Sequence, residues 1–175
     1  MGCTVSGASV LRGNTGTQLS ENLTPRQVEL VRETWTLLSV DMTATGIFIF
    51  NRFLTDYPEL CDLFPFVSIA NDGRYIWDDQ GLERHALGVM QALEGAVNNL
   101  ENTQLLSTIL FDLGQKHARY NVEESMLDKL WRSLRGSLKE ALQEKMTDEV
   151  EHAWFCVFRF VARQMIDGMR HYRNI

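Results

Sequence analysis

Residues 113–122 read LGQKHARYNV, and they place a histidine at the end of a segment that is otherwise typical of a buried helix. In and before this stretch, apolar side chains recur at intervals of three and four, the spacing of one α-helical face: Leu106, Ile109, Leu110 and Leu113. His117 lies four residues after Leu113 and continues the same face. Because burial of a titratable ring is costly without a partner, the sequence predicts a partner for His117 inside the fold.

His85 has the same setting as His117, whereas the other two histidines differ. His152 and His171 stand among charged or terminal residues, and we expect both to be solvated. His85 lies on the apolar stripe of a long amphipathic helix, which comprises Leu82, Ala86, Val89, Met90, Leu93, Ala96, Val97 and Leu100.

Two inward-facing histidines on separate helices favour a metal or haem site, although a single one is more often an ordinary core residue. Histidine is the usual ligand of haem iron, and a flat apolar macrocycle would explain why both rings face inward. Apolar walls for it are available in Phe50, Phe64, Val89 and Leu113. Zinc is the weaker alternative, since a structural zinc site takes four protein ligands and only two inward candidates are visible.

The composition narrows the class of protein. The length of 175 residues favours one domain with a tail, and 45% hydrophobic content suffices for a substantial core. The net charge of −6 argues against general nucleic-acid binding. The sequence contains no apolar run of about 18 residues, so it predicts no membrane-spanning helix. It also lacks an apolar signal core at its start, so secretion is not expected. Cys61 and Cys156 would be reduced in a cytosolic chain, but the sequence leaves a disulfide between them open.

Apolar spacing predicts an all-α domain over residues 23–175, preceded by a flexible tail over residues 1–22. Thr24 and Gln27 match a capping box, and Pro25 takes the first helical position. No strand alternation appears inside the domain. Further helices are expected at 46–54, 82–100, 106–117, 124–145 and from 147 onward, with a helical corner at 56–66 and a loop at 67–80.

The first six residues, MGCTVS, match the N-myristoylation pattern, with Gly2 as acceptor and Ser6 at the favoured hydroxyl position. A single myristoyl chain binds membranes with an association constant on the order of 10⁴ M⁻¹, so stable anchoring needs a second signal. Cys3 could supply it as a palmitoylation site. We therefore expect a lipid-anchored protein on the cytoplasmic side of a membrane; the alternative is a chance match in a flexible tail.

The order of these features along residues 24–172 resembles the globin family. The segment YPELCDLF looks like the globin corner, and its Phe64 matches the phenylalanine that packs against the haem. His85 matches the distal histidine of that family. His117 stands 32 residues later and matches the proximal, iron-ligating histidine.

Further matches support the resemblance. Trp35 stands where the first globin helix usually carries a tryptophan, and Val89 lies one turn after the distal histidine. Leu113 and Val122 match the apolar neighbours of the proximal histidine. The stretches GIFIFNRFL and LGQKHARYNV look most like neuroglobin and its relatives, and the MGC start is similar to that of the membrane-associated group called globin X.

The resemblance implies a globin fold of about seven or eight helices around haem b (iron protoporphyrin IX). It implies that His117 and His85 ligate the iron and that the cofactor is bound by Phe50, Phe64, His85, Val89, Leu113, His117 and Val122. Two positions depart from the family pattern. Gly88 replaces a base that often pairs with a haem propionate, for which Arg84 or Lys116 could substitute. Phe66 stands one residue before the expected second aromatic, at Val67.

A haem-binding globin would reversibly bind O2, CO and NO. His85 could donate to the bound ligand or ligate the iron itself, and the second behaviour suits redox chemistry, oxygen sensing or protection at a membrane. Nitric oxide dioxygenation or nitrite reduction is the enzymatic alternative, and it needs an external reductase because the chain has no room for a flavin or nicotinamide domain. Plain oxygen storage or transport and a haem-free interaction module are further alternatives.

Overall fold

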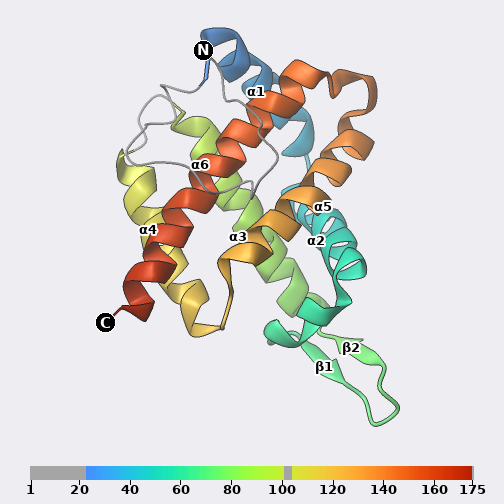
Figure 1. Ribbon diagram of the computed structural model, residues 1–175. Coiled ribbons are helices and arrows are strands. Elements are labelled where there is room, and N and C mark those ends of the chain that lie inside the picture. The colour runs from blue at the N-terminus through green and yellow to red at the C-terminus, as the bar shows by residue number, and fades with distance from the viewer. Residues whose placement is uncertain (1–22, 101–103, 175) are drawn as a thin grey trace.

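The computed structural model describes residues 23–100 and 104–174, which form a helical body with one protruding hairpin (Figure 1). The predicted tail of residues 1–22 lies outside the described residues. The elements in chain order are α1 (Pro25–Leu38), α2 (Met42–Asp56), the 3-10 helix η2 (Pro58–Leu63), β1 (Val67–Ile69), β2 (Tyr75–Trp77), α3 (Asp79–Asn98), α4 (Gln104–Arg119), α5 (Glu124–Leu142), the 3-10 helix η3 (Gln143–Lys145) and α6 (Asp148–Arg173).

Helix α1 begins where the sequence predicts, because the capping box forms. The Thr24 hydroxyl accepts a hydrogen bond from the Gln27 backbone N–H at 3.2 Å, and the Gln27 Oε1 accepts one from the Thr24 N–H at 2.9 Å. Pro25 is the first helical residue. Each bond satisfies a polar group that the helix start would otherwise leave without a partner.

The expectation of a loop over residues 67–80 is wrong for eight of those residues: six lie in β1 and β2, and Asp79 and Gln80 form the start of α3. β1 pairs antiparallel with β2, with Val67 opposite Trp77 and Ile69 opposite Tyr75. Gly73 turns the chain with a φ of +82°, which a glycine adopts without strain. Strands of three residues are too short to show an alternating pattern in the sequence, so the prediction from apolar spacing did not include them.

Two residues differ from the expected burial. Ile109 is 55% exposed, because the buried face of α4 follows Leu106, Leu110 and Gly114 instead. His152 is half-buried rather than solvated. Its Nδ1 accepts from the Gln27 amide at 3.1 Å, since the Oε1 of that amide is already held by the capping box.

The buried side chains form two clusters, one mainly on α1, α3, α4, α5 and α6 and a smaller one on α2, η2 and the start of α3. Cys61 lies in the smaller cluster and Cys156 in the larger, and both are free thiols, so the disulfide left open by the sequence is not formed. Burial raises the pKa of the Cys61 thiol.

Glycines set how closely each histidine-bearing helix approaches a neighbouring helix: α4 approaches α6, and α3 approaches α2. A Cβ on Gly114 of α4 would collide with the backbone carbonyl of Met165 on α6, and a Cβ on Gly168 of α6 would collide with that of Phe111 on α4. A Cβ on Gly46 of α2 would lie 2.8 Å from the carbonyl oxygen of Ala86, next to His85 on α3. These crossings therefore bring backbones into direct contact.

In the described part of the chain, no single helix combines the length and the apolar character that crossing a membrane requires. The pair α1 and α2 meets both criteria only when taken together, and the two helices are bent by 97° relative to one another.

The crossing of α4 and α6 predicts a sharp difference between two glycine substitutions. Gly114→Ala should lower the free energy of unfolding by about 1–3 kcal/mol through overpacking against the Met165 backbone. Gly95→Ala, whose new Cβ meets only Leu106 at 3.7 Å, should raise it by about 0.5–1 kcal/mol. Urea denaturation followed by circular dichroism measures both. Equal stabilities for the two variants would show that the helices can move apart at no cost.

Candidate functional site

A cavity of about 460 Å³ lies between α2, η2, α3, α4, α5 and α6. Its volume is within the range of pockets that hold cofactors, roughly 300–1,000 Å³. Among the residues that line it, only four carry a side-chain nitrogen or oxygen: His85, Lys116, His117 and Tyr120. The site is therefore a largely apolar crevice with a few polar groups, as an amphiphilic ligand requires.

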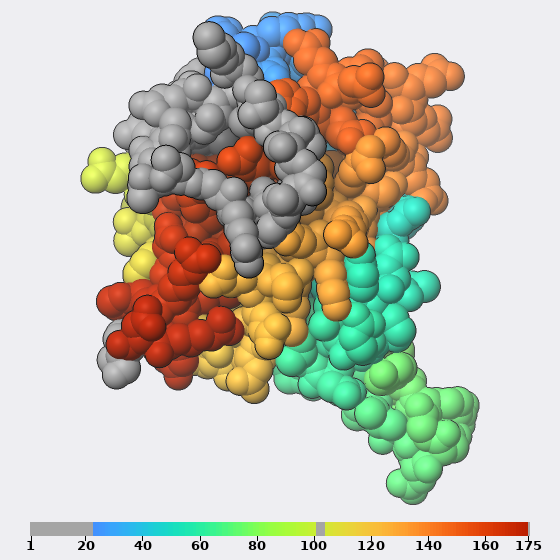
Figure 2. Space-filling model, viewed as in Figure 1, coloured from blue at the N-terminus to red at the C-terminus, as the bar shows by residue number. Residues whose placement is uncertain are grey.

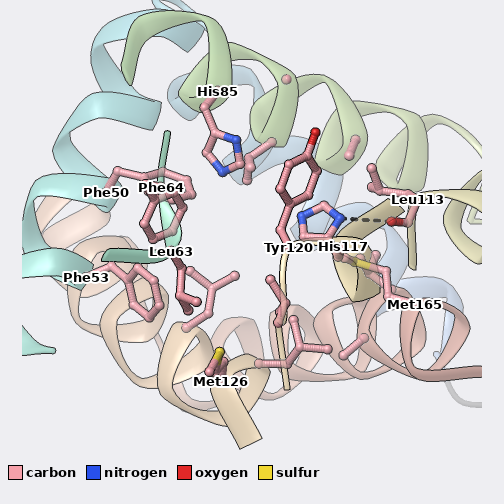
Figure 3. Close-up of a pocket in the computed structure, with 18 of the residues that line it drawn as sticks. Phe50, Phe53, Leu63, Phe64, His85, Leu113, His117, Tyr120, Met126 and Met165 are labelled. Atoms are coloured by element: carbon pink, nitrogen blue, oxygen red, sulfur yellow. Dashed lines mark hydrogen bonds between the residues drawn. The ribbon is translucent and has the colours of Figure 1, made fainter. Parts of the chain in front are cut away.

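His117 is oriented by its own helix. Its Nδ1 lies 2.9 Å from the carbonyl oxygen of Leu113, one turn earlier in α4, and donates its proton to it. The neutral imidazole has one protonated nitrogen, so Nε2 keeps its lone pair and points into the cavity (Figure 3). Burial lowers the pKa of His117, and the hydrogen bond to Leu113 opposes that effect. The ring is thus a neutral imidazole with a fixed tautomer, and its Nε2 is free to ligate a metal.

The end of α4 follows directly after His117. The backbone N–H groups of Tyr120 and Val122 both donate to the His117 carbonyl, at 3.0 and 3.3 Å. Asn121 adopts a left-handed φ of 59°, a conformation that asparagine tolerates better than most residues. The chain therefore turns away from the helix axis just past the histidine, and Val122 returns to the cavity wall.

His85 is held by aromatic contacts. Its ring centroid lies 4.8 Å from that of Phe50, 5.5 Å from that of Phe64 and 5.7 Å from that of Phe66. Burial lowers the pKa of His85 to about 4, with a smaller contribution from His117, so the imidazole is neutral at pH 7. Within residues 23–100 and 104–174, no group hydrogen-bonds either ring nitrogen.

The structure places all seven sequence-predicted pocket residues in the wall of this one cavity: Phe50, Phe64, His85, Val89, Leu113, His117 and Val122. Figure 3 shows His85 on α3 and His117 on α4 with their rings directed into the same space. Their roles toward a cofactor stay predictions. Phe66, whose place one residue early departed from the family pattern, is buried against His85 and Phe64.

Sequence reasoning missed the far wall of the cavity and one residue at its mouth. The far wall is built by apolar residues of α5 and α6, whose helical spacing does not distinguish a cavity wall from a packed core: Leu127, Leu130, Leu134, Phe158, Val161, Ala162 and Met165. Tyr120 lines the cavity although it is 60% exposed, so it lies at the mouth. Its position three residues after His117 was a usable signal, because such residues share a helix face.

The basic residues that could replace the base missing at Gly88 differ in their position relative to the mouth of the cavity. Gly88 is exposed, and a Cβ built on it meets no atom within 4 Å. Lys116 lines the cavity from α4. Arg84 instead lies 3.7 Å from the carboxylate of Asp78, and Arg119 stacks over the ring of Tyr172. Of the two expected substitutes, Lys116 lines the cavity, whereas Arg84 lies beside Asp78; the role of either toward a propionate stays a prediction.

These residues fit a haem. The donor set consists of two neutral imidazoles, which are suitable axial ligands for iron. The apolar walls suit a porphyrin, and the cationic and hydroxyl groups at the mouth suit its carboxylates.

Comparisons with known proteins agree with this fit. The family model described as Globin matches residues 47–165. A neuroglobin of Dissostichus mawsoni is 26% identical over 148 residues, covering 85% of this chain and 93% of the relative. Cytoglobin-2 of Danio rerio is 27% identical over 140 residues, covering 79% and 78%. The crystal structure of a hexacoordinated heme protein from an anhydrobiotic tardigrade superposes with a TM-score of 0.73 at 23% identity, covering 85% of this chain and 96% of that one.

The fold and the cavity define an all-α haem-binding protein of the class that takes up gaseous ligands such as O2. The chain belongs to the globin family. The predicted all-α globin fold and the resemblance to neuroglobins are thereby confirmed.

Proposed function

We propose that this globin binds haem b and that both His85 and His117 hold its iron in the resting state. The observation that carries the proposal is the free state of the His85 nitrogens: the ring is neutral, has no hydrogen-bond partner among the described residues, and faces the same apolar space as Nε2 of His117. The haem supplies the iron that reversibly binds diatomic ligands.

The protein's own residues divide the work of holding the group. The hydrogen bond to Leu113 fixes the ring of His117 so that Nε2 faces the cavity, and it would make the imidazole a better donor to the iron. Phe50, Phe64 and Val89 exclude water from the side of His85. Lys116 and Tyr120 lie at the mouth, where an ammonium group and a phenol can bind the porphyrin carboxylates.

His85 then controls access. As a ligand of the iron, His85 would compete with every external ligand, such as O2, CO or NO. If it occupies the iron about 99% of the time, the apparent affinity for an external ligand falls about a hundredfold. A protein with this property is poorly suited to bulk oxygen storage. It is better suited to redox chemistry, oxygen sensing or protection, because the iron keeps similar ligands in both oxidation states.

The proposal predicts a gain of external ligand binding in His85→Leu. The apparent CO affinity of the ferrous protein should rise about a hundredfold, since the internal competitor is gone. Flash photolysis and CO titration measure this change. His171→Leu is the control, because His171 is exposed and is not a cavity-lining residue. A five-coordinate deoxy-ferrous spectrum of the unmodified protein would contradict the proposal.

We also propose that acyl chains on Gly2 and Cys3 attach the protein to the cytoplasmic side of a membrane, as the similarity to globin X implies. The support is the sequence pattern MGCTVS, which lies outside the described residues. Two adjacent acyl chains provide the two signals that stable anchoring requires. Anchoring would place the haem protein beside membrane-bound redox partners.

The membrane proposal predicts different distributions for two glycine variants of the tail. Gly2→Ala should move the protein from the membrane pellet to the soluble fraction of expressing cells, since alanine cannot be N-myristoylated. Gly7→Ala lies just outside the pattern and should leave the distribution unchanged. Fractionation with immunoblotting reads out both, together with label from a myristate analogue. A Gly2→Ala protein that stays in the pellet would overturn the proposal.

A further inference from the structure

The β1–β2 hairpin exposes four large apolar side chains on six strand residues. Ile69 is 56% exposed, Ile76 54%, Tyr75 38% and Trp77 37%. We call these four residues the hairpin surface. The hairpin projects from the body of the molecule (Figure 2), so it is accessible to a partner. Exposed aromatic and aliphatic groups concentrated in this way are typical of interaction sites.

The hairpin also offers free backbone groups. Ser68 pairs with Ile76 inside the ladder, while Ala70 N–H donates to Arg74 O and Asp78 N–H to Phe66 O. In an antiparallel pair the alternate residues direct their N–H and C=O outward. Those residues on β2 are Tyr75 and Trp77. The outer edge of β2 is therefore a template to which a further strand can add.

Two contacts join the hairpin to the body of the molecule. The Tyr75 hydroxyl donates to the carbonyl of Pro58 at 3.2 Å, which joins β2 to η2. A Cβ on Gly81 would collide with the Cβ of Phe66, so the first turn of α3 packs directly against the start of the hairpin. A partner would thus meet a preorganised edge, which lowers the entropic cost of binding.

The surroundings of the hairpin are acidic. Between residues 58 and 84 the chain has two arginines, Arg74 and Arg84, no lysine, and six carboxylates: Glu59, Asp62, Asp72, Asp78, Asp79 and Glu83. Three of the six carboxylates are paired with bases: Asp72 with Arg74, Asp78 with Arg84, and Glu59 with Lys129 of α5. Among the described residues, Asp62, Asp79 and Glu83 form no ion pair and make up the acidic rim of the hairpin. The Tyr75 hydroxyl donates to the carbonyl of Pro58, the residue before Glu59, so Tyr75 lies beside η2. Burial raises the pKa of Tyr75, and the charge of Asp62 raises it further.

The negative charge around the hairpin surface favours a basic partner over an acidic one. A second copy would bring an equally acidic rim, and like charges facing each other oppose association. An anionic lipid surface would be repelled in the same way. We infer that the hairpin surface docks a basic protein segment in extended conformation, which adds as a strand to the outer edge of β2 and places lysine or arginine side chains against the acidic rim.

Docking would act on the distal pocket through Phe66. Its ring lies 5.1 Å from that of Phe64 and 5.7 Å from that of His85, and its carbonyl accepts the Asp78 N–H at the base of the hairpin. A strand bound to β2 therefore alters the packing that orients His85. The docking step is independent of the haem, whereas this coupling rests on the proposed ligation by His85.

The test uses the full-length haem-loaded protein and a fluorescein-labelled nine-residue peptide of alternating lysine and valine. Fluorescence anisotropy should show saturable binding that weakens at least tenfold between about 20 mM and about 500 mM salt. Surface charges interact strongly at the lower concentration and are largely screened at the higher one. A glutamate–valine peptide of the same length should not bind. Asp62→Asn with Glu83→Gln should weaken binding, and Leu105→Thr, an exposed position on α4, should not.

Two variants at one position isolate strand addition. Trp77→Thr removes the indole and keeps the outward N–H, whereas Trp77→Pro also removes that N–H without touching the β1–β2 ladder. The proline variant should bind the peptide at least tenfold more weakly than the threonine variant. Circular dichroism and the haem spectrum check that both variants fold.

Equal binding by these two variants, or no saturable binding by the unmodified protein, would overturn the proposal. A dimer in sedimentation velocity that Trp77→Thr dissolves would assign the surface to a second copy instead. Hairpin-dependent binding of Gly2→Ala to phosphatidylserine vesicles would assign it to lipid. Peptide binding with an unchanged haem spectrum would overturn only the coupling through Phe66 and leave the docking proposal standing. A five-coordinate resting protein that still binds the peptide would overturn only the proposed ligation by His85.

Discussion

The close crossing of α4 and α6 is the constraint on which the site depends. Gly114 and Gly168 let the two backbones touch, and this contact fixes α4 against the longest helix of the described structure. His117 follows Gly114 by three residues, so its position is set by backbone contact rather than by flexible side chains. The hydrogen bond to Leu113 then fixes the ring itself. The orientation of Nε2 is thus built into the packing before any ligand arrives.

The two histidines are held by different kinds of force. His117 is tied to its helix by a directional hydrogen bond, whereas His85 rests against three aromatic rings that fix its plane less strictly. Aromatic contacts are each worth about 0.5–1.5 kcal/mol and permit rotation more readily than a buried hydrogen bond. This difference suits a permanent ligand on one side and an exchangeable ligand on the other. It also means that groups touching the aromatic cluster, Phe66 in particular, can influence exchange.

Local chemistry explains which features the sequence could predict. The capping box at Thr24 needs only four consecutive residues, and it forms as expected. The inward direction of His85 and His117 follows from helical periodicity, which depends on neighbours three and four residues away. The paired strands, the exposure of Ile109 and the bond between His152 and Gln27 depend on contacts between distant segments. The walls on α5 and α6 could not be predicted because a cavity wall and a packed core have the same composition. Tyr120 was missed because its ring is largely exposed and yet lines the cavity.

The account rests on ligation of a haem iron by His117, and an absorption spectrum of His117→Gly with and without added imidazole tests it most directly. Removal of the ring should abolish the low-spin bis-imidazole spectrum of the haem-loaded protein. Imidazole supplied in solution should restore it by entering the space that the side chain left. A variant whose spectrum is identical to that of the unmodified protein, and unaffected by imidazole, would contradict the central claim.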